Sequence, residues 1–466
     1  MSTLNLEQPR KAIERAIADF QNQHDVNQLL IDIRTALIGF VEELIVSVVE
    51  HLLSDPHFLK TLKVMAGKSA LRFSGFKPTS IRLLSGQSFP IDSPYFSKVP
   101  AKARRGRKSK KRKAKSGDHL GLSVLGFIDR CSCVLTSSAV QAALLCPSFE
   151  IAKRSLLSFG IEMNIKTIRR LCLSLGDQAI EHRHCIALSD ADGVENRTLL
   201  VCIDGGRLRE RTAKRGRRPA GQKRQGYHTD WREPTQIVIQ WLDPDGSKTE
   251  QSVALYDATL ADIDGAFELL EGHLRRIDVA KADTVIFCAD GARRYWKRFS
   301  SLAKKLKIQT HYEVIDYTHA KQNLRLVADD LPKKLGEKKL AAITEDWKNK
   351  LWQGKLGEIH TQIQQLIKSP TKRKRALNKF KNYFLNNSHR MQYAAFRNLN
   401  LPTGSGCVES AIRRVINLRL KSPGIFWKRE TAEVMLFLRS TLLCGRWHIM
   451  LKNLLLLNRG QLEGRH

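Results

Sequence analysis

The sequence predicts an α/β protein built around a mixed sheet, and three features of its second half support this prediction. Two short hydrophobic runs, LLVCIDGG and TVIFCADGA, break off at Asp-Gly pairs that contain Asp204 and Asp290. Uninterrupted apolar runs rich in Val and Ile are typical of strands buried on both faces of a sheet. Far downstream, SGCVESAIRRVINLRL has helical spacing and carries Glu409. Three carboxylates from separate elements can therefore meet at one edge of the sheet.

The composition indicates a polyanionic partner. The 466-residue chain has a formal charge of +33 and a pI near 10.0, an excess that favours nucleic-acid binding through counterion release. Its length allows two to four domains. Cysteines such as Cys202 and Cys288 sit in apolar runs and are expected to pack as small hydrophobes. The chain has no apolar run of membrane-spanning length and its N-terminus lacks a signal-peptide pattern, so we expect a cytoplasmic protein that joins the nucleoid when bound to DNA.

The N-terminal part, residues 1–97, is predicted to be mainly helical, with a small irregular or β-containing stretch after residue 66. Residues 98–117 form a basic segment in which eleven Lys or Arg residues occur between Lys98 and Lys115 without an acid. Such charge density predicts a disordered linker. Within it, Arg104, Arg105 and Arg107 flank a glycine as in the core of an AT-hook that enters the minor groove. We favour the alternative of a generic phosphate-binding arm.

Residues 118–195 are predicted to form successive helices. The short GIEMN connection and the spacing of Ile165, Ile168 and Leu171 fit a helix-turn-helix-like DNA-binding region. Its last helix would present Lys166, Arg169 and Arg170 to DNA. An ordinary helical hairpin has the same pattern, so that alternative stays open.

The region from residue 196 to 320 alternates strand and helix signals in the order β-β-β-α-β-α-β. An Asp-Pro-Asp-Gly turn joins the second strand to the third. This order is that of a ribonuclease H-like domain, in which a meander joins parallel strands. An Arg-rich insert between Arg207 and Arg224 suggests a hairpin tip that grips DNA, or a solvated loop.

The gap between Asp290 and Glu409 is longer than one strand and its crossover require. We therefore predict an all-helical insertion at residues 321–400, and completion of the core by residues 401–466 with the Glu409 helix and C-terminal helices. In that helix Glu409, Ile412, Ile416 and Leu420 share one stripe, so the carboxylate faces the sheet if the apolar residues do. Ser405 is the expected N-cap. The alternative is a surface Glu409 paired with Arg413 four residues on.

Carboxylates at neighbouring strand ends repel one another unless a cation lies between them. Oxygen ligands that leave positions open for water and phosphate suit Mg²⁺, with Mn²⁺ as an alternative. Two such ions could activate a hydroxyl and stabilise the leaving oxygen in an in-line displacement.

Several blocks together resemble the DDE transposases of bacterial insertion sequences. They are the Asp-Gly strand end at Asp204, the Trp231-Arg232-Glu233 block, the Asp-Gly-Ala block at Asp290, the block from Ile315 to Ala320, the Gly-x-x-Glu-Ser helix at Glu409 and the stretch from Arg419 to Trp427. The resemblance implies that Asp204, Asp290 and Glu409 are a metal-binding catalytic triad. Asp316, as an alternative ligand to Asp290, and His319 form a further polar block at a strand end.

The resemblance also implies a function, namely binding of insertion-sequence ends and metal-dependent DNA cleavage and strand transfer. The partners would be double-stranded DNA, at element ends and target, and further copies of the chain, with no membrane. Candidate DNA contacts in this region are Arg413, Arg419 and Lys421. Trp427 is expected to pack under the Arg419 loop or to stack on a base. The alternatives are a catalytically inactive DNA-binding protein of the same fold and a ribonuclease H-like nuclease.

Overall fold

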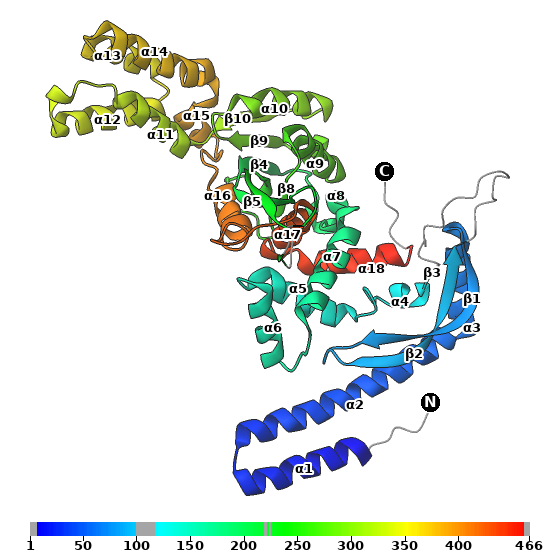
Figure 1. Ribbon diagram of the computed structural model, residues 1–466. Coiled ribbons are helices and arrows are strands. Elements are labelled where there is room, and N and C mark those ends of the chain that lie inside the picture. Colours follow the sequence, from blue (N-terminus) through cyan, green and yellow to red (C-terminus); the bar gives the residue numbers. More distant parts are fainter. Residues whose placement is uncertain (1–6, 99–116, 219–220, 223–224, 461–466) are drawn as a thin grey trace. The chain divides into compact units, whose positions relative to one another are not determined.

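The computed structural model describes residues 7–98, 117–218, 221–222 and 225–460 (Figure 1). The chain divides into two compact units, residues 1–181 with 451–466, and residues 182–450. The predicted basic linker, with Arg104, Arg105 and Arg107, lies outside the described residues. The division between the units falls inside the predicted 118–195 and 401–466 segments.

The first unit begins with helices and continues into a small sheet. Helices α1 (Glu7–Gln23), α2 (Val26–Ser54) and α3 (Pro56–Lys68) follow the predicted helical pattern. The helical pattern ends at Lys68, and the β-containing stretch expected after residue 66 follows. In it β1 (Leu71–Arg82) and β2 (Ser88–Lys98) pair antiparallel, with β3 (Gly117–Asp118) beside β2. Prolines in both strands disfavour a helix. Alternating residues such as Ile81 and Ile91 instead pack with Leu53 of α2.

Four more helices of this unit lead to the boundary between the units. They are α4 (Leu120–Val124), α5 (Cys133–Leu145), α6 (Phe149–Ser158) and α7 (Ile165–Ile180). The side chains of Ser132, Ser148 and Asn164 cap the last three by accepting backbone N–H bonds. On α7, Lys166 is exposed and Arg169 half-buried, whereas Arg170 pairs with Asp129 at 2.5 Å.

The second unit is built on a five-stranded mixed sheet in the order β10-β9-β4-β7-β8. The strands are β4 (Thr198–Gly205), β7 (Thr235–Leu242), β8 (Leu255–Thr259), β9 (Thr284–Ala289) and β10 (His311–Ile315). β7 is antiparallel to β4 and β8, while β4, β9 and β10 are mutually parallel. This mixed α/β arrangement is compatible with a ribonuclease H-like core.

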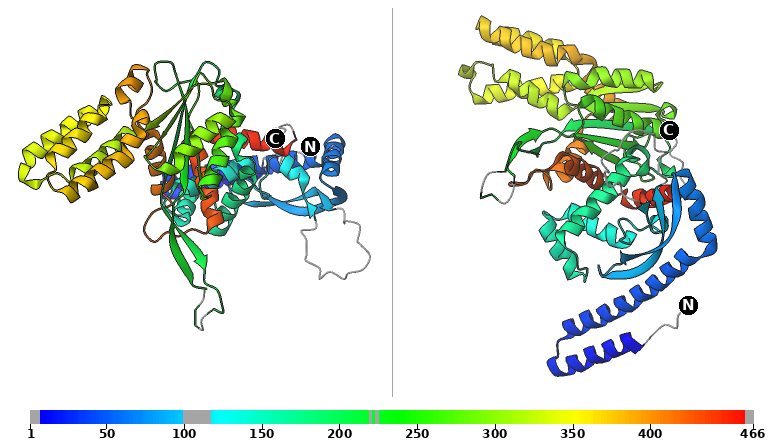
Figure 2. Two further views of the ribbon diagram at one scale, coloured as in Figure 1. Left: turned by 90° about the horizontal axis from the view of Figure 1, so that it is seen from above. Right: turned by 45° about the vertical axis from the view of Figure 1, so that its right-hand side comes forward.

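A separate two-stranded hairpin interrupts the meander. Strands β5 (Leu208–Ala213) and β6 (Tyr227–Arg232) pair antiparallel between β4 and β7 in the chain, where the sequence suggested a hairpin tip. Figure 2 shows this hairpin, in green, projecting from the sheet of the same unit.

Helices cover both faces of the sheet. On one face Val201 and Phe287 pack with Phe267 of α9 (Ile263–Arg276) and Phe299 of α10 (Arg293–Lys305). On the other face α16 (Gly406–Ile412) contacts β4 and β7, and α17 (Arg429–Leu443) contacts β8 (Figure 1). Short elements in this unit are α8 (Arg183–Ile186), η1 (Asp190–Asp192), η2 (Val279–Lys281) and the π-helical turn η5 (Arg413–Asn417).

Between β10 and α16 the chain forms a group of helices. They are α11 (Tyr317–Ala328), η3 (Lys333–Leu335), α12 (Glu337–Trp352), α13 (Leu356–Leu366), α14 (Pro370–Tyr383), η4 (Leu385–Arg390) and α15 (Tyr393–Asn398). Their aromatic core joins the sheet, since the Tyr393 hydroxyl donates to the Ile315 carbonyl at 3.0 Å. The last helix within the described residues is α18 (Trp447–Asn458). Across the described residues no single helix is long and apolar enough to cross a membrane, and only the bent pair α17 and α18 passes by length and composition.

Candidate active site

The three parallel strands carry an acidic residue at the same end. The register pairs Cys202 with Cys288, and extending it by two residues brings Asp204 level with Asp290. Likewise Ile315 pairs with Ala289, so Asp316 follows β10 where Asp290 follows β9. Because aligned residues of neighbouring strands project to the same face, these residues form an acidic row at the carboxyl edge of the sheet.

The Glu409 helix packs against this edge. The Cys407 thiol lies 3.4 Å from the Cys202 thiol, and Asp204 and Glu409 each follow one of these cysteines by two residues. Gly206, just beyond Asp204, has no side chain where Ile416 and Ile412 approach, and a Cβ there would collide with Ile416. The predicted apolar stripe is confirmed, since Ile412, Ile416 and Leu420 are all buried. Glu409 itself remains 48% exposed.

Electrostatic contacts join the predicted trio. Burial raises the pKa of the Asp204 carboxyl, and the negative charges of Asp290 and Glu409 raise it further. The Gly205 N–H, which donates to Asp204 Oδ1 at 2.7 Å, and the nearby His319 act in the opposite direction. The charges of Asp290 and Glu409 therefore disfavour the ionised form of Asp204, and a nearby divalent cation would favour it.

Asp316 holds the start of α16 against the start of α11. Its Oδ1 accepts the His319 backbone N–H at 2.8 Å and its Oδ2 accepts the Ser405 hydroxyl at 2.9 Å. The prediction that the Ser405 side chain caps the Glu409 helix is wrong, because that hydroxyl donates to Asp316 instead. Burial opposes ionisation of Asp316, but these hydrogen bonds outweigh burial and lower its pKa to about 2.

His319 lies between Asp316 and Glu409. Its Nδ1 is 3.1 Å from Asp316 Oδ1 and 3.9 Å from Glu409 Oε1, and the hydrogen bond to Asp316 raises the His319 pKa to about 9. Potential ligand atoms of Asp316, His319 and Glu409 lie within 4.8 Å of one another. This group shares Glu409 with the predicted trio. Among the ion pairs of the described residues, Glu409 is paired with His319 and not with Arg413.

We expect replacement of Asp316 by Ala to destabilise the second unit more than the same change at another helix cap. Loss of the cap costs about 1 kcal/mol, and the buried Ser405 groups left unpaired add about 1–3 kcal/mol. Asp262, which caps α9 through the Gly265 N–H, is the matched control, and Asp262→Ala should lose only the cap contribution. All seven tryptophans lie within residues 182–450, so urea unfolding followed by tryptophan fluorescence reports this unit. Equal losses in the two variants would contradict the bridging role of Asp316.

Three side chains that the sequence did not single out as site residues surround the acidic edge. Glu233 approaches Gly205 so closely that a Cβ on that glycine would collide with it, and it pairs with Arg294 at 2.6 Å. The Tyr383 ring occupies the space beside Gly291. Glu233 belongs to the Trp-Arg-Glu block that resembles the DDE family, which was the one available signal. Tyr383 comes from the helical region, and nothing in its local sequence indicates its position.

The predicted DNA contacts near this edge differ in exposure. Arg413 and Lys421 are exposed on the segment that follows Glu409. Arg419 is only 3% exposed, and its guanidinium lies 5.1 Å from the centre of the Trp427 ring. The prediction of a DNA contact at Arg419 is therefore contradicted by its burial. Trp427 is itself buried and donates to the Leu420 carbonyl, so it packs under the Arg419 loop.

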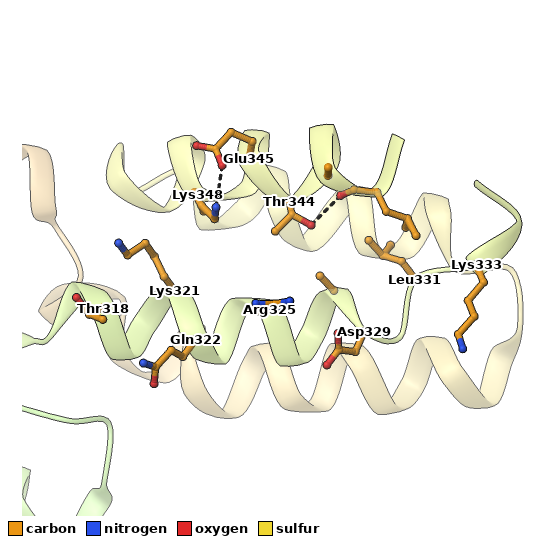
Figure 3. A pocket seen from close by; sticks show the side chains of 13 residues that line it. Thr318, Lys321, Gln322, Arg325, Asp329, Leu331, Lys333, Thr344, Glu345 and Lys348 are labelled. Carbon is orange, nitrogen blue, oxygen red and sulfur yellow. Dashed lines mark hydrogen bonds and ion pairs between the residues drawn. The ribbon is translucent and has the colours of Figure 1, made fainter. Parts of the chain in front are cut away.

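A pocket of about 650 Å³ lies between α11 and α12 (Figure 3). Its lining includes the cationic side chains of Lys321, Arg325, Lys333 and Lys348, which suit anionic groups better than a metal ion. Asp204, Asp290 and Glu409 are not part of it. This pocket is therefore distinct from the acidic edge, although α11 also carries His319.

Comparisons with known proteins add little to this geometry. No family model matches the sequence, and no curated protein matches it. Among solved structures, a Drosophila P element transposase strand transfer complex is similar at a TM-score of 0.24 and 13% identity, over 67% of this chain and 79% of that chain. A likeness this weak carries no argument about fold or function, so the assignment depends on the site itself.

Proposed function

We propose that this protein is a DDE-type transposase that binds the ends of a mobile DNA element and catalyses metal-dependent cleavage and strand transfer. The observation that supports the proposal is that Asp290, after β9, and Glu409, on α16, both lie near enough to Asp204 on β4 to raise its pKa. Asp204 follows a buried strand, Asp290 is level with it in the extended register, and Glu409 acts on the Asp204 pKa from the opposing helix. A solvent-facing acidic cluster on a strongly cationic chain fits chemistry on a polyanionic backbone.

The residues present suit a hard divalent cation. The trio offers oxygen ligands only. Burial and the charges of Asp290 and Glu409 raise the pKa of Asp204, and such a cation would offset both effects. Asp204, Asp290 and Glu409 would hold Mg²⁺ or Mn²⁺, which would activate the attacking hydroxyl and stabilise the leaving oxygen. In our proposal Asp316 and His319 position the start of the Glu409 helix, and Glu233 and Arg294 form the rim of the site.

DNA contacts in this proposal come from both units. Lys166 and Arg169 on α7 support a role for the helices after residue 118 in binding element ends. Arg413 and Lys421 support contacts to the phosphates near the cleavage position. Arg170 contributes less, since Asp129 already neutralises it. We also propose that the chain acts as a homo-oligomer on DNA, and the exposed apolar side chains of Leu30, Leu37 and Val41 along α2 support this.

A strand-transfer reaction tests the proposal. A labelled duplex made from the DNA that borders this reading frame should be nicked in the presence of Mg²⁺ or Mn²⁺ and joined to a supercoiled plasmid. A duplex of scrambled sequence is the control. Cleavage of both duplexes without joining would replace the proposal with a nuclease. End-specific binding with no metal-dependent cleavage would leave a DNA-binding protein of the same fold.

A further inference from the structure

The hairpin formed by β5 and β6 carries a face on which arginines alternate with exposed aromatic rings. Its register places Arg209 opposite Trp231, and Ala213 opposite Tyr227, with Arg211 between them. Paired residues of antiparallel strands project from the same face. The Arg209 guanidinium lies 5.4 Å from the Trp231 ring centre, and that of Arg211 lies 5.7 Å from Tyr227. Trp231 is nevertheless 57% exposed and Tyr227 43% exposed.

The base of this hairpin is fixed to the rest of its unit. The Trp427 N–H donates to the Arg209 carbonyl at 2.9 Å, and the Arg211 N–H donates to the Trp427 carbonyl at 2.8 Å. The Phe426 ring lies 4.6 Å from the Arg209 guanidinium and 5.7 Å from the Tyr227 ring. Trp427 and Phe426 therefore attach the hairpin to the rest of its unit. The strand that carries Trp231 and Tyr227 pairs with this anchored strand, and both rings keep an exposed surface.

The charge of the hairpin is strongly positive. Residues 207–232 contain ten Lys or Arg residues and two acids. One acid, Glu210, is 6% exposed and accepts from Arg232 at 2.7 Å on the other face of the hairpin. Toward the tip, Lys214, Arg215 and Arg217 are exposed. The charge of the hairpin therefore favours an anionic partner.

We propose that the Arg209–Trp231–Tyr227 face of the hairpin binds unpaired bases of a nucleic-acid strand. Trp231 and Tyr227 stack on the bases, while the arginines and the tip cations contact the phosphates. The bases of an intact duplex already stack on one another, and a side chain that enters them must first unstack a base step. The exposed surfaces of these rings can stack on unpaired bases without that cost. This inference extends the proposed function by naming the feature of the substrate that the hairpin recognises. It depends on the proposed function in one respect, namely that the bound strand is DNA.

Binding by the full chain in EDTA tests this assignment, because no metal-dependent cleavage can occur there. The probes are fluorescently labelled 15-nucleotide strands of deoxythymidine and uridine and a mixed-sequence duplex of equal length, followed by anisotropy at about 0.15 M salt. Trp231→Ala should weaken single-strand binding at least about fivefold and duplex binding by less than about twofold. Trp231→Phe keeps a flat ring and should retain most of the affinity. Phe76→Ala, which removes another exposed ring from β1, should change neither.

Three results would overturn the assignment. The first is unchanged single-strand binding in Trp231→Ala, and the second is an equal loss of affinity for the single strand and the duplex in that variant. The third is that Trp231→Ala loses self-association but not nucleic-acid binding, which would make this face a contact between copies of the chain. Because Trp231 is exposed, its replacement should leave the urea midpoint nearly unchanged, and that measurement excludes a folding defect. Preference between the two labelled strands distinguishes DNA from RNA. If Trp231→Ala loses single-strand binding but the parent protein shows no metal-dependent cleavage, the proposed function is wrong and the assignment of the hairpin stands.

Discussion

Asp204→Asn should abolish metal-dependent DNA cleavage while leaving binding to element ends almost unchanged. We expect a fall in rate of at least about 10³-fold, since metal ions contribute roughly several kcal/mol of transition-state stabilisation and about 1.4 kcal/mol corresponds to a factor of ten. Asn keeps the shape of the side chain but removes the charge that would hold the cation. Single-turnover cleavage of a labelled end duplex measures the effect, and a gel-shift assay measures binding.

The stability of this variant separates a functional role from a structural one. The raised pKa of Asp204 means that the fold disfavours its ionised form, so removing the charge should not destabilise the metal-free protein. Asp243→Asn is the matched control, because Asp243 directly follows β7, which runs antiparallel to β4 and so ends at the opposite edge of the sheet. That variant should cleave normally. Cleavage by Asp204→Asn within about tenfold of the parent rate would remove Asp204 from the site.

Arg446→Met should produce the largest loss of stability in the second unit. Arg446 is fully buried, and its guanidinium donates to both oxygens of Asp192, at 2.6 and 2.7 Å, and to the Ala187 carbonyl. It therefore ties the junction of α17 and α18 to η1. Methionine fills similar space but leaves Asp192 buried without its partner. Breaking a buried pair in this way costs about 3–5 kcal/mol, measured by urea unfolding with tryptophan fluorescence.

The pH dependence of this loss follows from Asp192. Burial alone would raise its pKa, but the hydrogen bonds and charge of Arg446 outweigh burial and hold the pKa below its usual value. A lowered carboxyl pKa contributes stability above the unfolded-state pKa of about 4, and this contribution is lost as the pH falls. The deficit of Arg446→Met should thus shrink in acid. Arg298→Met is the control, since its pair with exposed Asp264 is worth about 0–1 kcal/mol. A similar loss in both variants would contradict this account.

The sequence predicts the sheet of the second unit well because its strands are buried on both faces. Val201 and Phe287 lie in uninterrupted apolar runs, which are typical of strands covered on both faces, and both residues are fully buried. Sequence spacing cannot, however, supply the register that aligns Asp204 with Asp290, because register depends on the pairing of strands far apart in the chain. A β-containing stretch was expected after residue 66, but the bounds of β1 and β2 were not predicted because prolines and a glycine mask their alternation.

The candidate site shows a similar limit. The buried face of the Glu409 helix was predicted correctly from the spacing of Ile412 and Ile416, whereas Glu409 itself is about half exposed. Arg419 was misassigned, since a basic side chain is normally exposed, and only the tertiary structure brings Trp427 beneath it. The role of Ser405 was also misjudged. A serine before a helix is usually a cap, but the carboxylate of Asp316, 89 residues earlier in the chain, lies closer to its hydroxyl.

The position of a bound Mn²⁺ ion tests the central claim most directly. Anomalous diffraction from crystals of the protein grown with Mn²⁺ would locate the ion without reference to any reaction. Our account predicts a peak in contact with the carboxylates of Asp204 and Asp290 and beside Glu409. A peak held by Asp316, His319 and Glu409, with Asp204 and Asp290 turned away, would contradict it.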